Sequence, residues 1–191
     1  MKRTIDVVGA AGGLTVSALP MAVLALLIRR DLGSPVLFRQ SRPGRDARLF
    51  TLVKFRTMRD GSAPDEERLT KLGRFLRSTS LDELPELWNV LRGDMSLVGP
   101  RPLLTAYLER YSERQARRHE VRPGLTGLAQ VEGRNLLDWE QRFELDVRYV
   151  DTWTVSGDFL IILRTILSVL RRDGISAEGH ATMPEFRGAS E

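Results

Sequence analysis

The first apolar run lies near the N-terminus, where the 22 residues from Val7 to Ile28 carry no charge. At the rise of an α-helix this run reaches about 33 Å, enough to cross the core of a bilayer. It ends in Arg29-Arg30 instead of a small-residue cleavage site, which argues against a cleaved signal peptide. The pattern therefore predicts a membrane-associated helix.

Two features leave the course of this helix open. Lys2-Arg3 and Arg29-Arg30 flank the run equally, so the positive-inside bias gives a straight span no clear direction. Pro20 lies within the run, where it would kink or break a helix. The residues thus allow either a spanning helix or a re-entrant helix-break-helix that returns to the same face, with Ser17 or Thr15 covering the freed carbonyls.

The next stretches predict a hairpin and short helices. Residues 36–58 read as short strands around a Pro43-Gly44 turn, and the acidic piece from Asp60 to Glu67 reads as a loop. A helical apolar face follows at Leu69, Leu72, Phe75 and Leu76.

The segment from Arg77 to Pro102 combines a helical pattern with clustered charge. Its apolar residues at i, i+3, i+4 and i+7 are Leu84, Leu87, Trp88 and Leu91. Ser80 and Glu83 have the spacing of a capping box, which predicts a helix start near Ser80. Pro85 would remove a backbone hydrogen bond from such a helix. The alternatives are a helix that loses this bond and a regular helix that begins nearer Pro85.

The C-terminal half reads as helical with one loop. We expect a charged, basic surface helix over 103–120, and a loop with a short strand over 122–134. A helix over 136–150 has core spacing at Trp139, Phe143, Val147 and Val150. The apolar stretch 159–170 is too short to span, and its basic edge fits a helix lying in the membrane plane, although a soluble core helix would read similarly.

Composition adds limits on partners and chemistry. A chain of 191 residues is one domain's worth, and its net charge of +4 favours a polyanionic partner. The basic segment 103–120 carries no nucleic-acid motif, so we expect no nucleic-acid partner. The absence of Cys excludes disulfides and thiolate metal sites. His119 and His180 are lone histidines, for which we expect neither a metal nor a catalytic role.

The adjacent acids Asp82 and Glu83 are the strongest candidates for chemistry. Acids in a first helical turn are ordinary complements of the helix dipole, and Glu83 could simply close the capping box. In the alternative reading one carboxylate is a nucleophile and the other binds Mg²⁺, which prefers one or two carboxylates plus substrate phosphates. The flanks favour the alternative, because Arg77 and Arg101 supply guanidiniums suited to phosphate.

The chain resembles a known family, the monotopic phosphoglycosyl transferases, also called bacterial sugar transferases. The resemblance covers nearly the whole chain and rests on several long motifs in the family's order: Pro35 to Gln40, Lys54 to Met58, the Asp82-Glu83 segment, Gly93 to Pro102, Arg122 to Gln130, and Gly133 to Asn135. A thinner match, from Gly174 to His180, is similar to the small, minimal members that handle diacetylbacillosamine.

The resemblance implies an α+β, mainly helical fold. It implies a re-entrant membrane anchor over 1–30, commonly broken at Ser-Pro where this chain has Leu19-Pro20, a catalytic domain with a short hairpin and interfacial helices over 31–172, and a tail over 173–191. It also implies a location on the cytoplasmic face of the bacterial inner membrane. Homo-oligomerisation stays open.

The implied reaction moves a sugar 1-phosphate from a UDP-sugar, with an N-acetylated amino sugar expected, to polyprenyl (undecaprenyl) phosphate and releases UMP. Asp82 is the implied nucleophile of a covalent intermediate, and Glu83 the ligand of Mg²⁺. The residues implied to bind phosphate or nucleotide are Lys54, Arg56, Arg77, Pro100, Arg101, Pro102 and Asp146. For Asp146 a structural ion pair with an arginine is an alternative role.

A second hypothesis, a non-enzymatic basic scaffold or anionic-lipid-binding protein anchored to the membrane, explains the charge and the anchor. It leaves the arrangement of Asp82, Glu83 and Gly99 to Pro102 unexplained.

Overall fold

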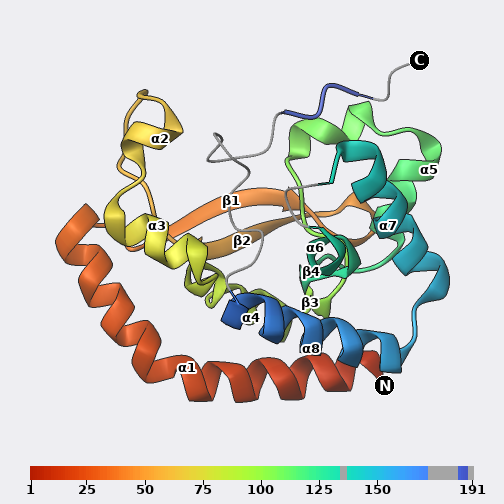
Figure 1. Cartoon of the computed structure of the whole chain (residues 1–191), viewed down its shortest axis with the longest axis horizontal. Helices are drawn as coiled ribbons and strands as arrows, with labels where there is room; N and C mark the ends of the chain where they lie inside the picture. Colours follow the sequence, from red (N-terminus) through yellow and green to blue (C-terminus); the bar gives the residue numbers. More distant parts are fainter. Residues whose placement is uncertain (134–136, 172–184, 189–191) are drawn as a thin grey trace.

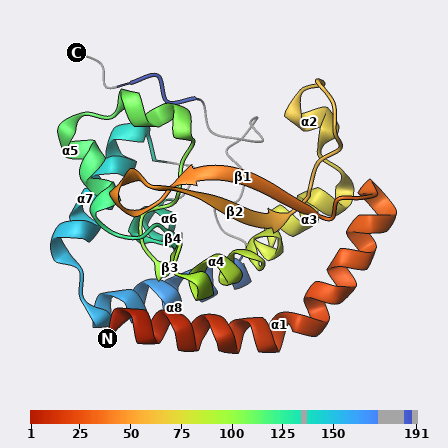
Figure 2. The same ribbon diagram turned by 180° about the vertical axis from the view of Figure 1, so that it is seen from behind.

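The computed structural model describes residues 1–133, 137–171 and 185–188. One long helix runs along one side of the molecule, and a two-stranded hairpin lies above it. The other helices lie at both ends of the hairpin and between the hairpin and the long helix (Figure 1, and from behind in Figure 2). The described part is therefore α+β and mainly helical, as predicted.

Helix α1 spans Lys2–Leu32 without interruption and contains Pro20. It bends visibly in both views (Figures 1 and 2). The expected break is thus a bend within one helix, because a proline removes one N–H and displaces a turn without necessarily ending the helix. The hydroxyls of Ser17 and Thr15 donate to Gly13 O (2.6 Å) and Ala11 O (2.9 Å), four residues back. They do not cover the carbonyl of Val16, which Pro20 leaves without its usual donor.

The N-terminal end of α1 is bound to the body of the protein by buried polar contacts. Asp6, which is 3% exposed, accepts hydrogen bonds from Ser96 Oγ (2.8 Å) and Leu97 N (2.9 Å). Lys2 Nζ forms an ion pair with Asp158 at 2.6 Å. The bonds of Asp6 hold the first two turns of α1 against residues 96–97, and the ion pair of Lys2 joins them to the helix that carries Asp158.

The other end of α1 is bound to the same body. Leu24 and Ile28 pack in a cluster with Phe55 and Leu76. Arg56 donates to the carbonyls of Leu32 and Gly33 that follow the last turn. Both ends of α1 therefore attach to one body. The helix is long and apolar enough to cross a membrane, and only 11% of its most apolar stretch is buried within the protein.

The predicted hairpin is confirmed. Strands β1 (Leu37–Pro43) and β2 (Leu49–Phe55) pair antiparallel, from Leu37 opposite Phe55 to Pro43 opposite Leu49, around a 3₁₀ turn η1 (Arg45–Ala47). The fully buried side chain of Asn89 joins β2 to the next layer, because it accepts from Val53 N (3.1 Å) and donates to Thr51 O (2.8 Å).

Two short helices follow: α2 (Asp65–Arg68) and α3 (Lys71–Ser78), which Thr70 caps. The predicted capping box at Ser80 was wrong. Ser80 adopts a left-handed conformation (φ 56°) and makes no capping bond within the described chain. A 3₁₀ turn η2 (Leu81–Glu83) comes next, and regular helix α4 (Glu86–Arg92) begins after Pro85, where the missing N–H costs no bond.

Helix α4 packs one face only. Leu87 is buried, whereas Trp88 is 51% exposed. The buried face of α4 is therefore narrower than the apolar face predicted from the sequence. After α4, strand β3 (Ser96–Val98) pairs in parallel with β4 (Gly124–Thr126), which confirms the short strand expected in the 122–134 loop. The short helix α6 (Leu128–Glu132) follows β4.

The single basic helix expected over 103–120 was wrong. The chain there forms η3 (Thr105–Arg110), α5 (Glu113–Ala116) and η4 (Arg117–Glu120). Ser112 and Gln115 form a capping box that starts a new helix, with bonds of 3.2 and 3.0 Å. Arg118 is buried, so this segment is not the uniformly basic surface that its sequence suggested.

The last two helices are close to expectation. Helix α7 spans Trp139–Thr152, with Asp138 as its cap, and α8 spans Val155–Arg171. Phe143 and Val147 on α7 are 1% exposed, as their spacing predicted. Of the tail, residues 185–188 are described, and Phe186 packs against Tyr107 and Phe143. The segment from Gly174 to His180 lies outside the described residues.

Candidate active site

The two adjacent acids lie in the 3₁₀ turn that leads into α4. Asp82 is buried (5% exposed), while the Glu83 side chain is 17% exposed and forms an ion pair with Arg101. Burial raises the pKa of the Asp82 carboxyl, and the neighbouring Glu83 raises it further. Lys54, Arg101 and Arg77 oppose this shift. Asp82 therefore lies close to three cations as well as to a second carboxylate.

Those cations come from three separate elements: Lys54 from β2, Arg77 from the last turn of α3, and Arg101 from the loop after β3. Burial lowers the pKa of Lys54 and of Arg77, and Asp82 is the largest opposing influence on each. Glu83 raises the pKa of Arg101. Arg77 Nε also donates to Thr57 Oγ1 (3.1 Å), which fixes the direction of its side chain.

Backbone contacts hold the loop that carries Arg101. Gly99 N donates to Thr126 O, and Gly124 N donates to Pro100 O, both at 2.9 Å. A Cβ on Gly124 would lie 2.1 Å from Gly99 N, so only glycine allows the two backbones to approach this closely. Pro100 and Pro102 are buried on either side of Arg101. They fix the backbone from which its guanidinium extends.

Asp146 is 2% exposed and receives two hydrogen bonds from Arg118, from Nε (3.0 Å) and Nη2 (2.8 Å). Burial raises the pKa of Asp146, which Arg118 opposes. Arg118 Nη2 also donates to the carbonyl of Arg101 at 2.6 Å. The pair thus supports the backbone of Arg101, and Asp146 lines the same cavity as Arg101.

Arg56, which the motif grouped with Lys54, lies elsewhere. It is 5% exposed, and its guanidinium is bound to the end of α1 and to Asp60 Oδ2 (3.0 Å). Side chains of successive strand residues point to opposite faces of a sheet, so Lys54 and Arg56 would share a face in a continuous strand. Because β2 ends at Phe55, however, this alternation does not extend to Arg56.

Sequence reasoning missed Glu86, which lies three residues after Glu83 on the first turn of α4. It is 3% exposed, and burial, with a further contribution from Glu83, raises its pKa to about 8. The i, i+3 spacing of two acids beside an apolar stripe was a signal that could have identified it.

Gln130 was also missed, although it ends one of the motifs quoted above. It lines the cavity, and neither atom of its buried amide has a hydrogen-bond partner within the described parts of the chain. Buried amides are normally hydrogen-bonded, so Gln130 is a candidate for a contact with a ligand.

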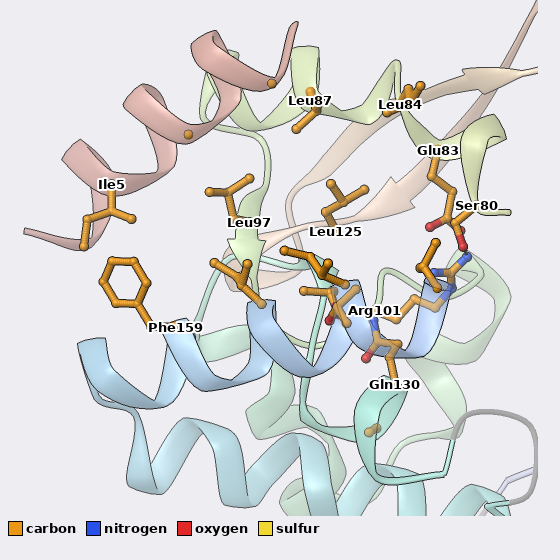
Figure 3. A pocket seen from close by; sticks show the side chains of 18 of the residues that line it. Ile5, Ser80, Glu83, Leu84, Leu87, Leu97, Arg101, Leu125, Gln130 and Phe159 are labelled. Carbon is orange, nitrogen blue, oxygen red and sulfur yellow. Dashed lines mark hydrogen bonds and ion pairs between the residues drawn. The ribbon is translucent and has the colours of Figure 1, made fainter. Parts of the chain in front are cut away.

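A cavity of about 1,000 Å³ is lined by Arg77, Glu83, Arg101, Gln130 and Asp146, whereas Asp82 and Lys54 are not among its lining residues. Figure 3 shows Glu83, Ser80 and Arg101 at one end, Ile5 and Phe159 at the other, and leucine side chains between them. The cavity is therefore charged at one end and apolar along most of its length.

Magnesium is the metal expected beside Asp82 and Glu83. Within residues 1–133, 137–171 and 185–188, no group of three or more His, Cys, Asp or Glu side chains forms a complete metal site. Asp82 and Glu83 nevertheless supply two neighbouring carboxylates, and Mg²⁺ commonly binds one or two carboxylates and completes its shell with phosphate and water. The residues fit a metal that a phosphate-bearing substrate helps to hold.

The positive charges of Lys54, Arg77 and Arg101 suit a ligand that carries two or three negative charges, such as a phosphate or diphosphate. Cations such as Arg77 and Arg101 can neutralise phosphate oxygens, and a carboxylate beside them is a group that can act as a nucleophile or bind a metal.

The model of the bacterial sugar transferase family matches residues 1–172. The chain is 49% identical to the uncharacterized sugar transferase EpsL of Bacillus subtilis, over all of this chain and 98% of that protein. It is 46% identical to the UDP-glucose:undecaprenyl-phosphate glucose-1-phosphate transferase of Caulobacter vibrioides, over 90% of this chain and 70% of that protein.

A further relative is the undecaprenyl-phosphate galactose phosphotransferase of Salmonella typhimurium, 40% identical over 91% of this chain but only 41% of that protein. The chain thus spans nearly the whole of one of these relatives, 70% of the second and about two fifths of the third. The names of these relatives mention glucose and galactose, so they do not support the resemblance to diacetylbacillosamine-type members.

Proposed function

Because the chain belongs to the bacterial sugar transferase family, we propose that it transfers a sugar 1-phosphate from a UDP-sugar to undecaprenyl phosphate and releases UMP. The proposal takes the reaction from the relatives' names. The observation that carries it is the turn with two adjacent acids, in which Asp82 is buried and Glu83 forms an ion pair with Arg101. Lys54, Arg101 and Arg77 all act to lower the pKa of Asp82. An anionic-lipid scaffold would have no use for that arrangement.

In the proposed first step, an Asp82 carboxylate oxygen attacks the phosphorus that bears the sugar. The bond from this phosphorus to the bridging oxygen breaks, and UMP leaves with the electron pair. In the second step, an oxygen of the lipid phosphate attacks the same phosphorus, and the bond to Asp82 breaks. One difficult displacement thereby becomes two easier ones, and Asp82 is regenerated.

The surrounding residues have separate tasks in this scheme. Arg77 and Arg101 neutralise the oxygens of the transferred phosphate, and Lys54 counters the charge of Asp82. Glu83 holds Arg101 and, on this proposal, a magnesium ion as well. When bound, that ion would supply further positive charge for the phosphate oxygens. Gln130 is assigned a hydrogen-bonding contact with the donor substrate.

We place the protein at the cytoplasmic face of the inner membrane, with α1 re-entrant. The support is that both ends of α1 bind one body, whereas a straight span would separate them across the bilayer. Large apolar side chains also remain exposed on α1, such as Val16, and on α8, such as Leu163. Cysteines at Thr4 and Asp31, which are both exposed, should share one labelling pattern in intact cells. Labelling from opposite faces would exclude a re-entrant α1.

The function is tested by measuring UMP release from a panel of UDP-sugars in the presence of undecaprenyl phosphate. The panel includes UDP-glucose, UDP-galactose and UDP-linked N-acetyl amino sugars, because the relatives and the tail motif point to different sugars. We expect lipid-dependent release with at least one donor and none from Asp82→Asn. No release with any donor would contradict the proposal and favour the scaffold.

A further inference from the structure

The apolar part of the cavity is larger than the proposed chemistry needs. Typical ligand pockets measure about 300 to 1,000 Å³, and this one lies at the upper limit. The phosphate-binding groups lie at one end of it (Figure 3). The walls of the remainder come from α1 (Ile5, Val8), α8 (Phe159, Ile162) and the residues Leu97 and Leu125.

Polar groups are scarce along these walls. Apolar surface of this extent gains free energy only from an apolar occupant, because water finds few partners there. The two helices that form the walls also carry the exposed apolar side chains that we assign to the membrane, so the cavity is continuous with that surface at Phe159, which is 57% exposed.

The backbone of α1 itself forms part of the wall. Gly9 and Gly13 both line the cavity, and a Cβ at Gly9 would lie 2.6 Å from Leu97 Cδ1. A Cβ at Gly13 would lie 3.1 Å from Leu87 Cδ1. The two glycines let α1 pack directly against the leucines that form the middle of the cavity.

We propose that this cavity binds the prenyl chain of the lipid acceptor, with its phosphate at the Arg101 end and its chain running between α1 and α8 toward Phe159 and Ile5. The inference rests on the proposed function, since that function supplies an acceptor with one anionic end and a long apolar chain. The two ends of the cavity match the two ends of such a lipid in charge. A soluble sugar acceptor would match only one end.

The inference makes a prediction about chain length. Phe159 lies at the end of the cavity opposite Arg101 (Figure 3). We therefore expect undecaprenyl phosphate to contact Phe159 and the much shorter chain of geranyl phosphate to end before it. A change at the far end should therefore affect the long acceptor alone.

The test compares two neighbouring residues of α8. Phe159 lines the cavity and is 57% exposed; Leu160 is 49% exposed and is not among the described residues that line it. Phe159→Glu and Leu160→Glu each add one charge to the same membrane-facing helix. We measure kcat/KM for undecaprenyl phosphate and for geranyl phosphate at saturating UDP-sugar, in the same detergent.

We expect Phe159→Glu to lower kcat/KM for undecaprenyl phosphate by about tenfold or more and to change the value for geranyl phosphate by less than about twofold, because only the long chain loses burial. Leu160→Glu should keep the wild-type ratio between the two acceptors. Ile5→Trp, which fills the same end by bulk instead of charge, should reproduce the effect of Phe159→Glu.

Equal changes for both acceptors, or equal effects of Phe159→Glu and Leu160→Glu, would overturn the inference and would fit a cavity filled by ordinary bilayer lipid. Wild-type UMP release with undecaprenyl phosphate is measured in the same series. A failure of the chain-binding inference therefore leaves that release intact, whereas a failure of the proposed function abolishes it.

Discussion

Asp146→Asn separates a structural from a catalytic role for a residue that the family resemblance placed at the substrate. Asp146 and Arg118 have side chains that are each 2% exposed and share two hydrogen bonds. Removing one partner of such a pair leaves a buried charge uncompensated, at a cost of about 3–5 kcal/mol. We expect the lower end of this range, because the asparagine oxygen still accepts a hydrogen bond from Arg118.

For a protein of this size, about 3 kcal/mol corresponds to a fall in Tm of roughly 6–12 °C. The unfolding of purified protein in detergent can be followed by tryptophan fluorescence. Glu144→Gln is the matched control, because Glu144 lies on the same helix and pairs with Arg114, but both side chains are more than half exposed. Such a pair contributes about 0–1 kcal/mol, so the control should unfold close to wild type.

Activity should fall together with stability in Asp146→Asn, because Arg118 also binds the carbonyl of Arg101. A variant as stable as Glu144→Gln that has nevertheless lost its activity would refute the structural argument. It would assign Asp146 a direct contact with substrate instead.

Three further predictions concern pH and the phosphate site. Burial lowers the pKa of His119 to about 4 from its ordinary 6.5, so between these pH values the unfolded state binds more protons than the folded state. The free energy of unfolding should therefore fall as the pH drops through this window, by about 2 kcal/mol after allowance for solvent screening. Urea unfolding of wild type and His119→Gln checks this, and parallel pH profiles would contradict it. Arg77→Lys and Arg101→Lys keep the charge but lose the planar fork, so each should lower kcat/KM for the UDP-sugar by about tenfold or more in the UMP-release assay; near-normal rates in both would mean that these arginines supply only a general field. Glu83→Gln should raise the magnesium concentration needed for half-maximal activity, measured after chelation and titration, and an unchanged requirement would remove Glu83 from the metal.

The sequence predicted the elements whose patterns are local and uninterrupted. The hairpin around Pro43-Gly44, α7 and α8 followed from alternation or helical spacing. The paired charges of Asp82 and Glu83 predicted an active site, and that assignment stays a prediction. The prediction of a single helix over 103–120 failed because the local sequence does not reveal the buried ion pair that Arg118 makes with a residue 28 positions away.

Other features depend on contacts that no local pattern contains. Ser80 has the residue type of a helix cap, but its backbone is left-handed at the junction of α3 and η2. Arg56 has the sequence context of Lys54, yet its guanidinium binds the end of α1, 23 and 24 residues earlier. The burial of Glu86 and the unpartnered amide of Gln130 likewise became visible only once distant segments were brought together.

The role of Asp82 as the nucleophile is tested most directly by intact-protein mass spectrometry of the enzyme mixed with its UDP-sugar in the absence of lipid. Covalent catalysis predicts release of about one equivalent of UMP and a protein heavier by one phosphosugar, located on Asp82 and missing in Asp82→Asn. Addition of undecaprenyl phosphate should then return the protein to its original mass. If the mass stays unchanged and UMP appears only after the lipid is added, the lipid phosphate attacks the donor directly and Asp82 is not the nucleophile.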